Sequence, residues 1–531
     1  MSKAKVIMVQ GTMSNAGKSL LVAGLCRVFS QDGYKVAPFK AQNMALNSFI
    51  TNEGLEMGRA QVVQAEACGI EPSVRMNPIL LKPVSDMGSQ VIVNGEVLGN
   101  MKAAEYYAYK TQLIPQVMAA YDSLAAENDI IVIEGAGSPA EINLRENDIV
   151  NMGMAKMAKA PVLLVGDIDR GGVFAQLLGT ISLLEQDEQA MIKATVINKF
   201  RGDPQILEPG LQILREKTGK PVAGVLPYLN VDIEDEDSLS SRLGNNRAGA
   251  ANVNPIDIAV IRLPHLSNFT DFMALEATTG LGVRYVSRLT ELGRPDMVIL
   301  PGTKNTMQDL KWLRQGGLEA AIKKLAAGGA IVFGICGGYQ MLGRQITDSE
   351  GVEGGGTMEG MDLLPIATEF AAEKHRTRMK GRLEKVQGAL AALSGAEVEG
   401  YEIHMGRSFY LAGNGGGDSA SGIDSGSDSV GGGDLGGGLQ GQPLLMLENG
   451  QPDGCQQANV YGSYLHGFFD SESCRQGLLT ALCSHKDIPP LQAAAFNMAQ
   501  YKKQQYDLLA EGVRRNMDMA LIYRILEEGI K

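Results

Sequence analysis

A glycine-rich loop near the start of the chain, set between a short apolar run and a helical segment, restricts the fold more than any other feature. Val6 to Gln10 has the character of a buried strand, the loop runs from Gly11 to Ser19, and Leu20 to Phe29 is helical in pattern. In that order, the backbone N–H groups of the loop and the N-terminus of the helix converge on one point, where a phosphate binds. The pattern predicts a parallel sheet flanked by helices.

The end of this loop carries the side chains that phosphate chemistry needs. Lys18 is expected to neutralise terminal phosphate charge, and Ser19 is expected to hold Mg²⁺ beside it. The loop has one residue more between its glycines than the standard P-loop, and in this it resembles the variant of dethiobiotin synthetases and their relatives. An ordinary glycine turn is the alternative interpretation. The predicted nucleotide-binding residues of the loop are Thr12, Asn15, Ala16, Gly17, Lys18 and Ser19.

Three further strand ends add candidate groups to this site. Glu134 ends the hydrophobic run Ile131 to Glu134 beside a glycine loop, which makes it a candidate Mg²⁺ ligand, although a carboxylate there can also be a solvated helix cap. Lys40 follows another short strand and is placed to approach a transferred phosphoryl group, although an isolated lysine is usually only solvated. Asn198 ends a third strand, and its amide can both donate to and accept from adenine.

The chain divides into segments of different composition. Short β-branched runs alternate with helical patterns up to about residue 230, which predicts a phosphate-loop domain with a parallel sheet over residues 1–232. An acidic and then Asn-, Ala- and Gly-rich linker is predicted over 233–255, and a second α/β domain over 256–485. Within it, the Gly- and Ser-rich residues 412–442 are predicted to be a disordered insertion. A helical tail is expected over 486–531, with apolar positions at Leu508, Leu509, Met517, Leu521, Ile522 and Leu526.

Composition narrows the class of partner. The 531 residues are enough for two or three domains. With 48 Lys and Arg against 60 Asp and Glu, the formal charge of −12 gives no support for a nucleic-acid-binding face, so a small-molecule partner is favoured. The six scattered cysteines form neither a disulfide framework nor a zinc pattern. Because charged residues interrupt the most apolar stretch, 161–184, and no secretory segment precedes the first motif, we expect a cytoplasmic protein without a membrane span.

A second chemical motif lies in the second domain. Ala330 to Leu342 reads as a strand, a Gly-x-nucleophile-x-Gly turn around Cys336, and a helix, which is the pattern of a nucleophile elbow. The elbow exposes the sulfur at a helix N-terminus, where a thiolate is favoured for attack on a carbonyl. A buried structural cysteine is the alternative.

A thiol nucleophile needs a base and a site for the developing oxyanion. We favour His466, which follows a strand-like segment, over its rival His404 in Gly400 to Arg407. Gly302 follows another strand, and its backbone N–H, with that of Gly337, is predicted to form an oxyanion hole, unless the first is only an ordinary turn.

Seven stretches of the chain together resemble the cobyric acid synthase family, the glutamine-dependent amidases of cobalamin biosynthesis, over essentially the whole length. They are residues 11–19, 38–47, 166–174, 198–203, 334–338, 400–407 and 461–467. The resemblance implies an N-terminal dethiobiotin-synthetase-like P-loop domain and a C-terminal class I glutamine amidotransferase-like α/β domain. It also implies amidation of carboxylates b, d, e and g of adenosylcobyrinic acid a,c-diamide, with ATP, Mg²⁺, glutamine and the corrinoid as small-molecule partners and no tightly bound prosthetic group. Cys336 would be the nucleophile and His466 its base.

One departure from the wider glutaminase class concerns the third member of the usual triad. That class has a Glu two residues after the histidine, whereas Phe468 stands there in this chain, and Glu402 is a candidate for the missing role. Two alternative functions remain. The sibling enzyme that amidates carboxylates a and c shares both domains, but residues 38–47 argue against it. A P-loop regulatory switch with a degenerate glutaminase module is disfavoured by the intact Cys336 and His466.

Overall fold

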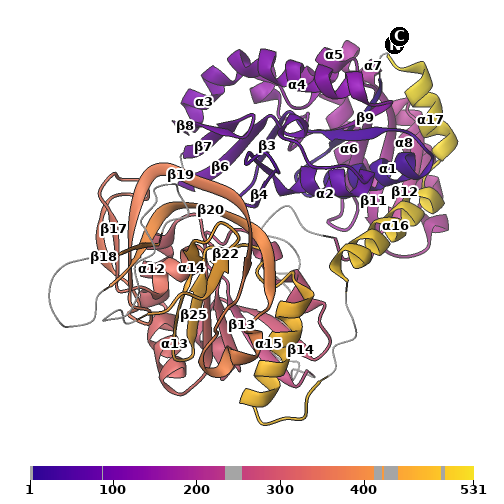
Figure 1. Cartoon of the computed structure of the whole chain (residues 1–531). Coiled ribbons are helices and arrows are strands. Elements are labelled where there is room, and N and C mark those ends of the chain that lie inside the picture. The colour runs from indigo at the N-terminus through magenta and orange to yellow at the C-terminus, as the bar shows by residue number, and fades with distance from the viewer. Residues whose placement is uncertain are drawn as a thin grey trace. The chain divides into compact units, whose positions relative to one another are not determined.

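The computed structural model describes residues 4–85, 88–233, 254–411, 421–423, 441–491 and 497–530. The chain forms two compact units (Figure 1). The first comprises Met1–Thr51, Leu55–Glu236 and Ala499–Lys531, and the second comprises Asn52–Gly54 and Asp237–Met498. Most of the predicted linker and most of the predicted insertion at 412–442 lie outside the described residues, and the domain boundaries drawn from the sequence stay predictions.

The first unit is built on a six-stranded sheet in which every neighbouring pair is parallel, in the order β12-β11-β10-β1-β9-β2. Its central strands are short apolar runs with both faces buried, as a sheet covered by helices on two sides requires. The predicted parallel sheet is therefore confirmed. The strands are β1 (Lys5–Gly11), β2 (Val36–Phe39), β9 (Ile130–Glu134), β10 (Val162–Asp167), β11 (Ile192–Phe200) and β12 (Val222–Pro227).

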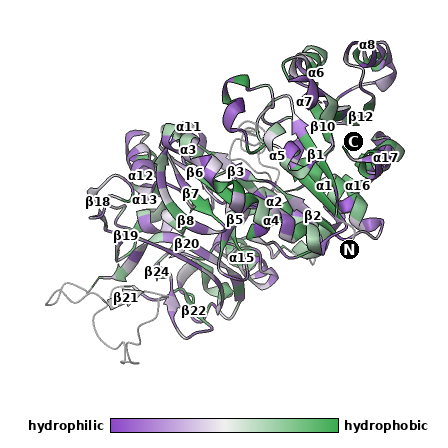
Figure 2. Cartoon of the chain, turned by 90° about the horizontal axis from the view of Figure 1, so that it is seen from above, coloured by the Kyte–Doolittle hydropathy of each residue, from purple (hydrophilic) through white to green (hydrophobic). Residues whose placement is uncertain are grey.

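Helices pack around the strands of this unit, and Figure 2 shows central strands in green among helices that carry both green and purple residues. The helices up to residue 218 are α1 (Lys18–Gln31), α2 (Arg59–Cys68), α3 (Ala103–Tyr109), α4 (Ile114–Glu127), α5 (Met152–Ala158), α6 (Val173–Ser182), α7 (Gln186–Met191) and α8 (Glu208–Thr218). A smaller sheet, in the order β3-β6-β7-β8, and a β4-β5 hairpin lie between β2 and α4 in the chain. Their strands are β3 (Gln42–Met44), β4 (Ser48–Ile50), β5 (Glu56–Gly58), β6 (Ile79–Ser85), β7 (Gly88–Val93) and β8 (Glu96–Lys102).

Two helices at the C-terminal end, α16 (Met498–Asn516) and α17 (Met519–Glu528), complete the first unit. Leu509 and Val513 of α16 share a buried apolar cluster with α1, and a Cβ on Gly24 of α1 would lie 2.6 Å from Val513 Cγ2. The helical pattern predicted for this stretch is present. Leu508, one of its expected apolar positions, is instead 50% exposed, because neighbouring residues of a helix point about 100° apart and Leu509 occupies the buried face.

The second unit is also centred on a six-stranded sheet, in the order β14-β13-β15-β16-β25-β24, parallel except for its β24–β25 edge pair. Its strands are β13 (Ile256–Ile261), β14 (Leu281–Val286), β15 (Met297–Leu300), β16 (Ile331–Ile335), β24 (Cys455–Gln457) and β25 (Val460–Ser463). Its helices are α10 (Met273–Glu276), α11 (Leu289–Leu292), α12 (Thr306–Gln315), α13 (Leu318–Ala327), α14 (Gly337–Leu342) and α15 (Glu472–His485). None of the helices among the described residues is long and apolar enough to span a membrane.

A second sheet of this unit contains the long antiparallel pair β19 (Ile366–Arg382) and β20 (Glu397–Tyr410), the curved orange ribbons of Figure 1. The sheet is completed by β17 (Gln345–Asp348), β18 (Gly356–Glu359), β21 (Ser421–Ile423), β22 (Leu445–Leu447) and β23 (Pro452–Asp453). One end of β20 runs beside the segment after β25, where Tyr401 and His466 exchange backbone hydrogen bonds. This pairing brings the strand to the carboxyl ends of β15 and β16, where the predicted thiol site lies.

Candidate phosphate and thiol sites

The glycine loop joins β1 to α1 in a tight turn. Gly17 has φ 90°, a left-handed conformation that favours glycine, and a Cβ there would lie 2.1 Å from Asn198 Nδ2. The Asn198 amide donates to the Ala16 carbonyl over 2.9 Å, so β11 supports the loop from the side. Thr12 at the start of the loop donates through Oγ1 to Gln176 at 3.1 Å. The structure thus brings Asn198 to the predicted loop, where it holds the backbone.

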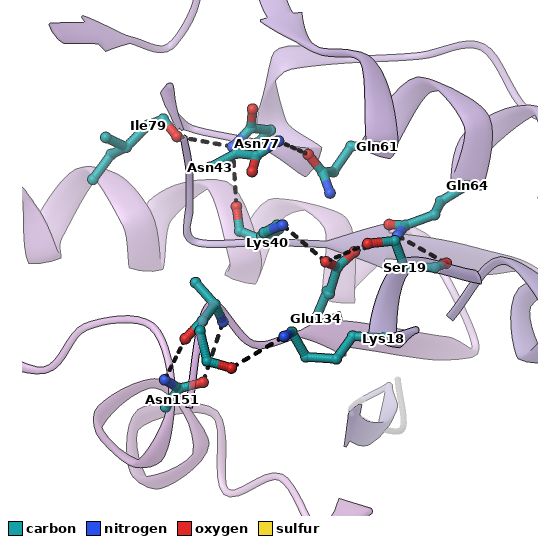
Figure 3. Close-up of polar contacts among 12 residues, drawn as sticks. Lys18, Ser19, Lys40, Asn43, Gln61, Gln64, Asn77, Ile79, Glu134 and Asn151 are labelled. Atoms are coloured by element: carbon teal, nitrogen blue, oxygen red, sulfur yellow. Dashed lines mark hydrogen bonds and ion pairs between the residues drawn. The ribbon is translucent and has the colours of Figure 1, made fainter. Parts of the chain in front are cut away.

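Lys18, the first residue of α1, lies across the loop. Its Nζ donates to the carbonyl oxygens of Met13 and Gly137, each at 3.0 Å. Gly137 belongs to the glycine loop after β9, and this loop is held in turn by Asn151, whose side chain exchanges hydrogen bonds with the backbone of Ala136 (Figure 3). The ammonium group is therefore held between two loops at the carboxyl ends of neighbouring strands, which is where ligands bind in open α/β sheets.

Glu134 is the centre of the polar contacts in Figure 3. Its Oε1 accepts from Ser19 Oγ at 2.8 Å and from Lys40 Nζ at 2.8 Å, and its Oε2 accepts from Gln64. The carboxylate is only 1% exposed, so these donors offset the cost of burying its charge. Three residues that the sequence analysis proposed separately, Ser19, Lys40 and Glu134, are thereby brought together.

The oxygen atoms at this point fit a magnesium ion. Mg²⁺ binds oxygen ligands at about 2.0–2.1 Å in octahedral geometry, so two neighbouring ligands lie about 2.9 Å apart. Ser19 Oγ and Glu134 Oε1 lie 2.8 Å apart in a hydrogen bond, so the two oxygens are close enough to bind one ion together. A hydroxyl and a carboxylate are also the donor types that this ion prefers.

The sequence analysis did not single out Gln64 or Asp167 as site residues. Asp167 is buried at the end of β10, and its carboxylate accepts from Lys199 Nζ at 2.9 Å. The same ammonium donates to the backbone carbonyl of Asn15 in the glycine loop at 2.6 Å. A signal for Asp167 was present, since it ends an apolar strand as Glu134 does, whereas nothing in the sequence around Gln64 marks that position.

The thiol motif folds as a sharp turn between β16 and α14. Cys336 has φ 50° and ψ −111°, a strained conformation for a residue with a side chain, and its N–H donates to the Ser463 carbonyl of the neighbouring strand at 2.9 Å. The flanking glycines permit the turn. A Cβ on Gly338 would lie 2.0 Å from Leu300 O, and one on Gly334 would lie 2.7 Å from the backbone of Tyr339. The predicted elbow geometry is present around Cys336.

His466 lies beside Cys336 and is nearly fully buried. Its Nδ1 is 2.7 Å from Asp271 Oδ2, and Asp271 Oδ1 accepts from the backbone N–H of Gly467 at 3.1 Å. Burial by itself lowers the pKa of His466, but the charge and hydrogen bond of Asp271, together with Cys336, outweigh burial and raise that pKa to about 10. Asp271 was not considered in the sequence analysis.

The two backbone groups proposed for an oxyanion hole come from adjacent segments. Gly337 is the first residue of α14, so its N–H has no acceptor within the helix. A Cβ on Gly337 would lie 3.2 Å from Thr303 N, and one on Gly302 would lie 2.9 Å from His466 Cε1. The loop after β15 therefore lies against both the elbow and the histidine.

His404 and Glu402 lie on β20 and form a different cluster. Glu402 Oε2 is 3.2 Å from His375 Nε2 and 3.6 Å from His404 Nε2, and His404 Nδ1 contacts the Gly406 carbonyl at 2.7 Å. The suggestion that Glu402 orients His466 is wrong, because its carboxylate faces these two histidines and Asp271 occupies Nδ1 of His466. Of the two candidate bases, His466 is the one next to the thiol.

Comparisons with known families give one family model for each of two parts of the chain. Residues 7–239 match the model of the CobQ/CobB/MinD/ParA nucleotide binding domain, and residues 257–474 match that of the CobB/CobQ-like glutamine amidotransferase domain. A nucleotide-binding unit and a glutamine amidotransferase unit in one chain define a glutamine-hydrolysing ligase.

Curated relatives match along the whole chain. "Cobyric acid synthase" of Ruminiclostridium cellulolyticum is 56% identical over 99% of this chain and 98% of its own length. The protein of that name from Lachnoclostridium phytofermentans is 57% identical over 99% of this chain and 100% of its own length. The one from Yersinia enterocolitica is 50% identical over 98% of both. The chain belongs to the cobyric acid synthase family.

Proposed function

We propose that this enzyme amidates carboxylates b, d, e and g of adenosylcobyrinic acid a,c-diamide to give adenosylcobyric acid, with ATP and glutamine as co-substrates. The observation that carries the proposal is the match over 99% of the chain to relatives named cobyric acid synthase. The two sites support it physically, because this reaction needs a phosphate site and a source of ammonia. The corrinoid cobalt belongs to the substrate.

The phosphate site activates the carboxylate. A carboxylate is a poor electrophile, so transfer of the γ-phosphoryl group from ATP first converts it to an acyl phosphate. Lys18 and the loop N–H groups between Thr12 and Ser19 offset the charge that develops on the transferred group, and Lys40 lies at the same strand ends. Mg²⁺, held by Ser19 and Glu134, would supply further charge neutralisation there.

The thiol site releases ammonia from glutamine. His466 Nε2 takes the Cys336 thiol proton, which leaves a thiolate beside the protonated ring. The sulfur then attacks the side-chain amide carbon, and the N–H groups of Gly302 and Gly337 stabilise the oxyanion. The histidine returns the proton to the departing ammonia, which leaves a thioester on Cys336. Water hydrolyses the thioester to glutamate. Ammonia attacks the acyl phosphate, and phosphate leaves as the amide forms.

A direct assay tests the proposal. Purified enzyme is incubated with adenosylcobyrinic acid a,c-diamide, ATP, Mg²⁺ and glutamine, and the corrinoid mass is followed. Four successive amidations are expected. Cys336→Ala should lower the rate with glutamine roughly a thousandfold or more and keep the rate with ammonia, because only the thiol step is removed.

Cys474→Ala is the matched control, since Cys474 is a buried cysteine of α15 in the same unit. It should keep the rate with either nitrogen source. An unchanged corrinoid mass with folded, nucleotide-binding enzyme would contradict the proposed substrate, and amidation of cobyrinic acid in its place would point to the sibling a,c-diamide reaction.

A further inference from the structure

A buried carboxylate from a distant part of the chain supplies the contact that the usual triad glutamate would make. We propose that Asp271 is the positioning residue for His466, so that a Cys336–His466–Asp271 arrangement hydrolyses glutamine. The inference rests on the proposed roles of Cys336 and His466. Asp271 is 195 residues from His466 in the chain, and it lies in the short 3₁₀ helix η5 (Phe269–Phe272).

Both oxygens of the Asp271 carboxylate contact the segment that carries the histidine. Oδ2 lies 2.7 Å from His466 Nδ1, and Oδ1 accepts from the Gly467 N–H at 3.1 Å. Two contacts to consecutive residues fix the carboxylate relative to both the ring and the backbone. Asp271 is 3% exposed, so water does not compete for these contacts.

The contact determines which nitrogen of the ring carries the proton. An ionised carboxylate can only accept, so His466 Nδ1 must donate to it, and the neutral ring then has its lone pair on Nε2. A lone pair on Nε2 is what the histidine needs to accept the Cys336 proton. When that proton arrives, the positive ring lies against the Asp271 charge in a buried site, which stabilises it.

Other groups restrict the ring without contributing an acidic charge. Tyr401 stacks on His466 with ring centroids 5.3 Å apart and an interplanar angle of 20°, and its hydroxyl accepts from Asn268 of the segment before Asp271. Gly302 lies close to the edge of the ring. Among the described residues, the titratable groups in contact with His466 are therefore Asp271, Cys336 and Tyr401, and Asp271 is the carboxylic acid of the three. Its effect on the pKa of His466, raised to about 10, agrees with this role.

Glutamate release from glutamine, measured without corrinoid, tests the inference in the full-length chain. Asp271→Asn keeps an acceptor for the Gly467 N–H but presents an amide N–H to His466 Nδ1, which favours the tautomer with its proton on Nε2. We expect kcat/KM to fall roughly 100- to 10,000-fold, mainly through kcat, as in a triad whose aspartate becomes asparagine. Asp271→Glu should restore part of the activity, because it restores the charge.

The pH profile separates positioning from a merely structural role. Without the carboxylate charge the pKa of His466 falls. As the pH rises, the ring that donates a proton to the leaving ammonia is then deprotonated at a lower pH than in the wild type. The alkaline limb of kcat/KM should move down by roughly one to two pH units in Asp271→Asn. Glu402→Gln, which removes a buried carboxylate of β20 that faces His375 and His404, should leave the profile in place.

Each part of the scheme can fail separately. If Cys336→Ala still releases glutamate, the proposed thiol mechanism is wrong. If Cys336→Ala is inactive but Asp271→Asn keeps the wild-type rate and profile, only the role of Asp271 is overturned. The role of Asp271 would also be overturned if Glu402→Gln shifted the pH profile of kcat/KM and Asp271→Asn left that profile unchanged. Activity lost in Asp271→Asn with an unmoved alkaline limb and no recovery in Asp271→Glu would assign Asp271 a structural role and reject the inference.

Discussion

Two buried carboxyl groups of the second unit have pKa values shifted in opposite directions, because the groups beside them differ. Burial would raise the pKa of Glu402, but hydrogen bonds from His375 and His404 lower it to about 2. Asp453 instead accepts hydrogen bonds from the Ser463 hydroxyl and the Tyr464 N–H. Burial, with the charge of Glu402, raises its pKa from 3.8 to about 7, although Ser463 donates to it. The sign of a charge beside a buried acid therefore decides its ionisation near neutral pH.

Asp453 should make stability pH-dependent. Its folded-state pKa lies above its unfolded value, so the folded state holds the proton more tightly, and the linked stability is lost as pH rises toward about 7. Asp453→Asn, which cannot ionise, should therefore gain stability over the wild type by roughly 2 kcal/mol between pH 5.5 and pH 7, and little more above pH 8. Thermal midpoints of both proteins across this range test it, and a constant difference would contradict it.

At the scale of elements, the C-terminal helix α16 belongs to the core of the first unit. It contributes Tyr506, Leu509, Ala510 and Val513 to the apolar cluster that contains one face of the β1–β10 sheet and α1. Arg514, at the end of α16, is ion-paired with Asp32 just after α1. A segment that the sequence presents as a tail is therefore part of the support for the glycine loop, because α1 begins at that loop.

Two consecutive leucines of α16 provide a matched test of this packing. Leu509 is fully buried and Leu508 is 50% exposed. Leu509→Ala should destabilise the first unit by about 2–5 kcal/mol, through lost apolar burial and the cavity left behind, whereas Leu508→Ala should change stability by less than about 0.5 kcal/mol. Denaturant unfolding, monitored through the loss of nucleotide binding, distinguishes the two variants. Equal effects on stability would mean that α16 does not pack as described.

At the scale of the whole molecule, the proposed reaction separates ammonia release from ammonia use. The thiol site lies in one unit and the phosphate site in the other. Ammonia that escapes into neutral solvent is protonated and no longer nucleophilic, so transfer within one chain should exceed transfer between chains.

Mixing two damaged enzymes tests transfer within the chain. Lys18→Ala should lose amidation with either nitrogen source, because its phosphate site cannot offset the charge of phosphoryl transfer, while Cys336→Ala should lose it with glutamine only. An equimolar mixture supplied with glutamine should form amide at least about tenfold more slowly than the wild type, because ammonia must cross the solvent. Corrinoid mass against time is the measurement, and a mixture as fast as the wild type would exclude protected transfer.

The sequence by itself determined the features that neighbouring residues encode. The glycine loop before α1 and the turn at Cys336 depend on glycine positions, apolar runs and a nucleophile within a few residues, so both were predicted together with the parallel sheets around them. The motif context was also enough to favour His466 over His404.

Only the tertiary structure decided which distant side chains meet. Asp271 reaches His466 across 195 residues, and Gln64 reaches Glu134 across 70, so neither pair has a spacing that a sequence pattern could reveal. Glu402 was a candidate to orient His466, but in β20 the alternation of strand side chains turns Glu402 and His404 toward the same cluster, away from His466. Backbone conformation is set largely by local residues, whereas the partner of a buried charge is set by how the elements pack.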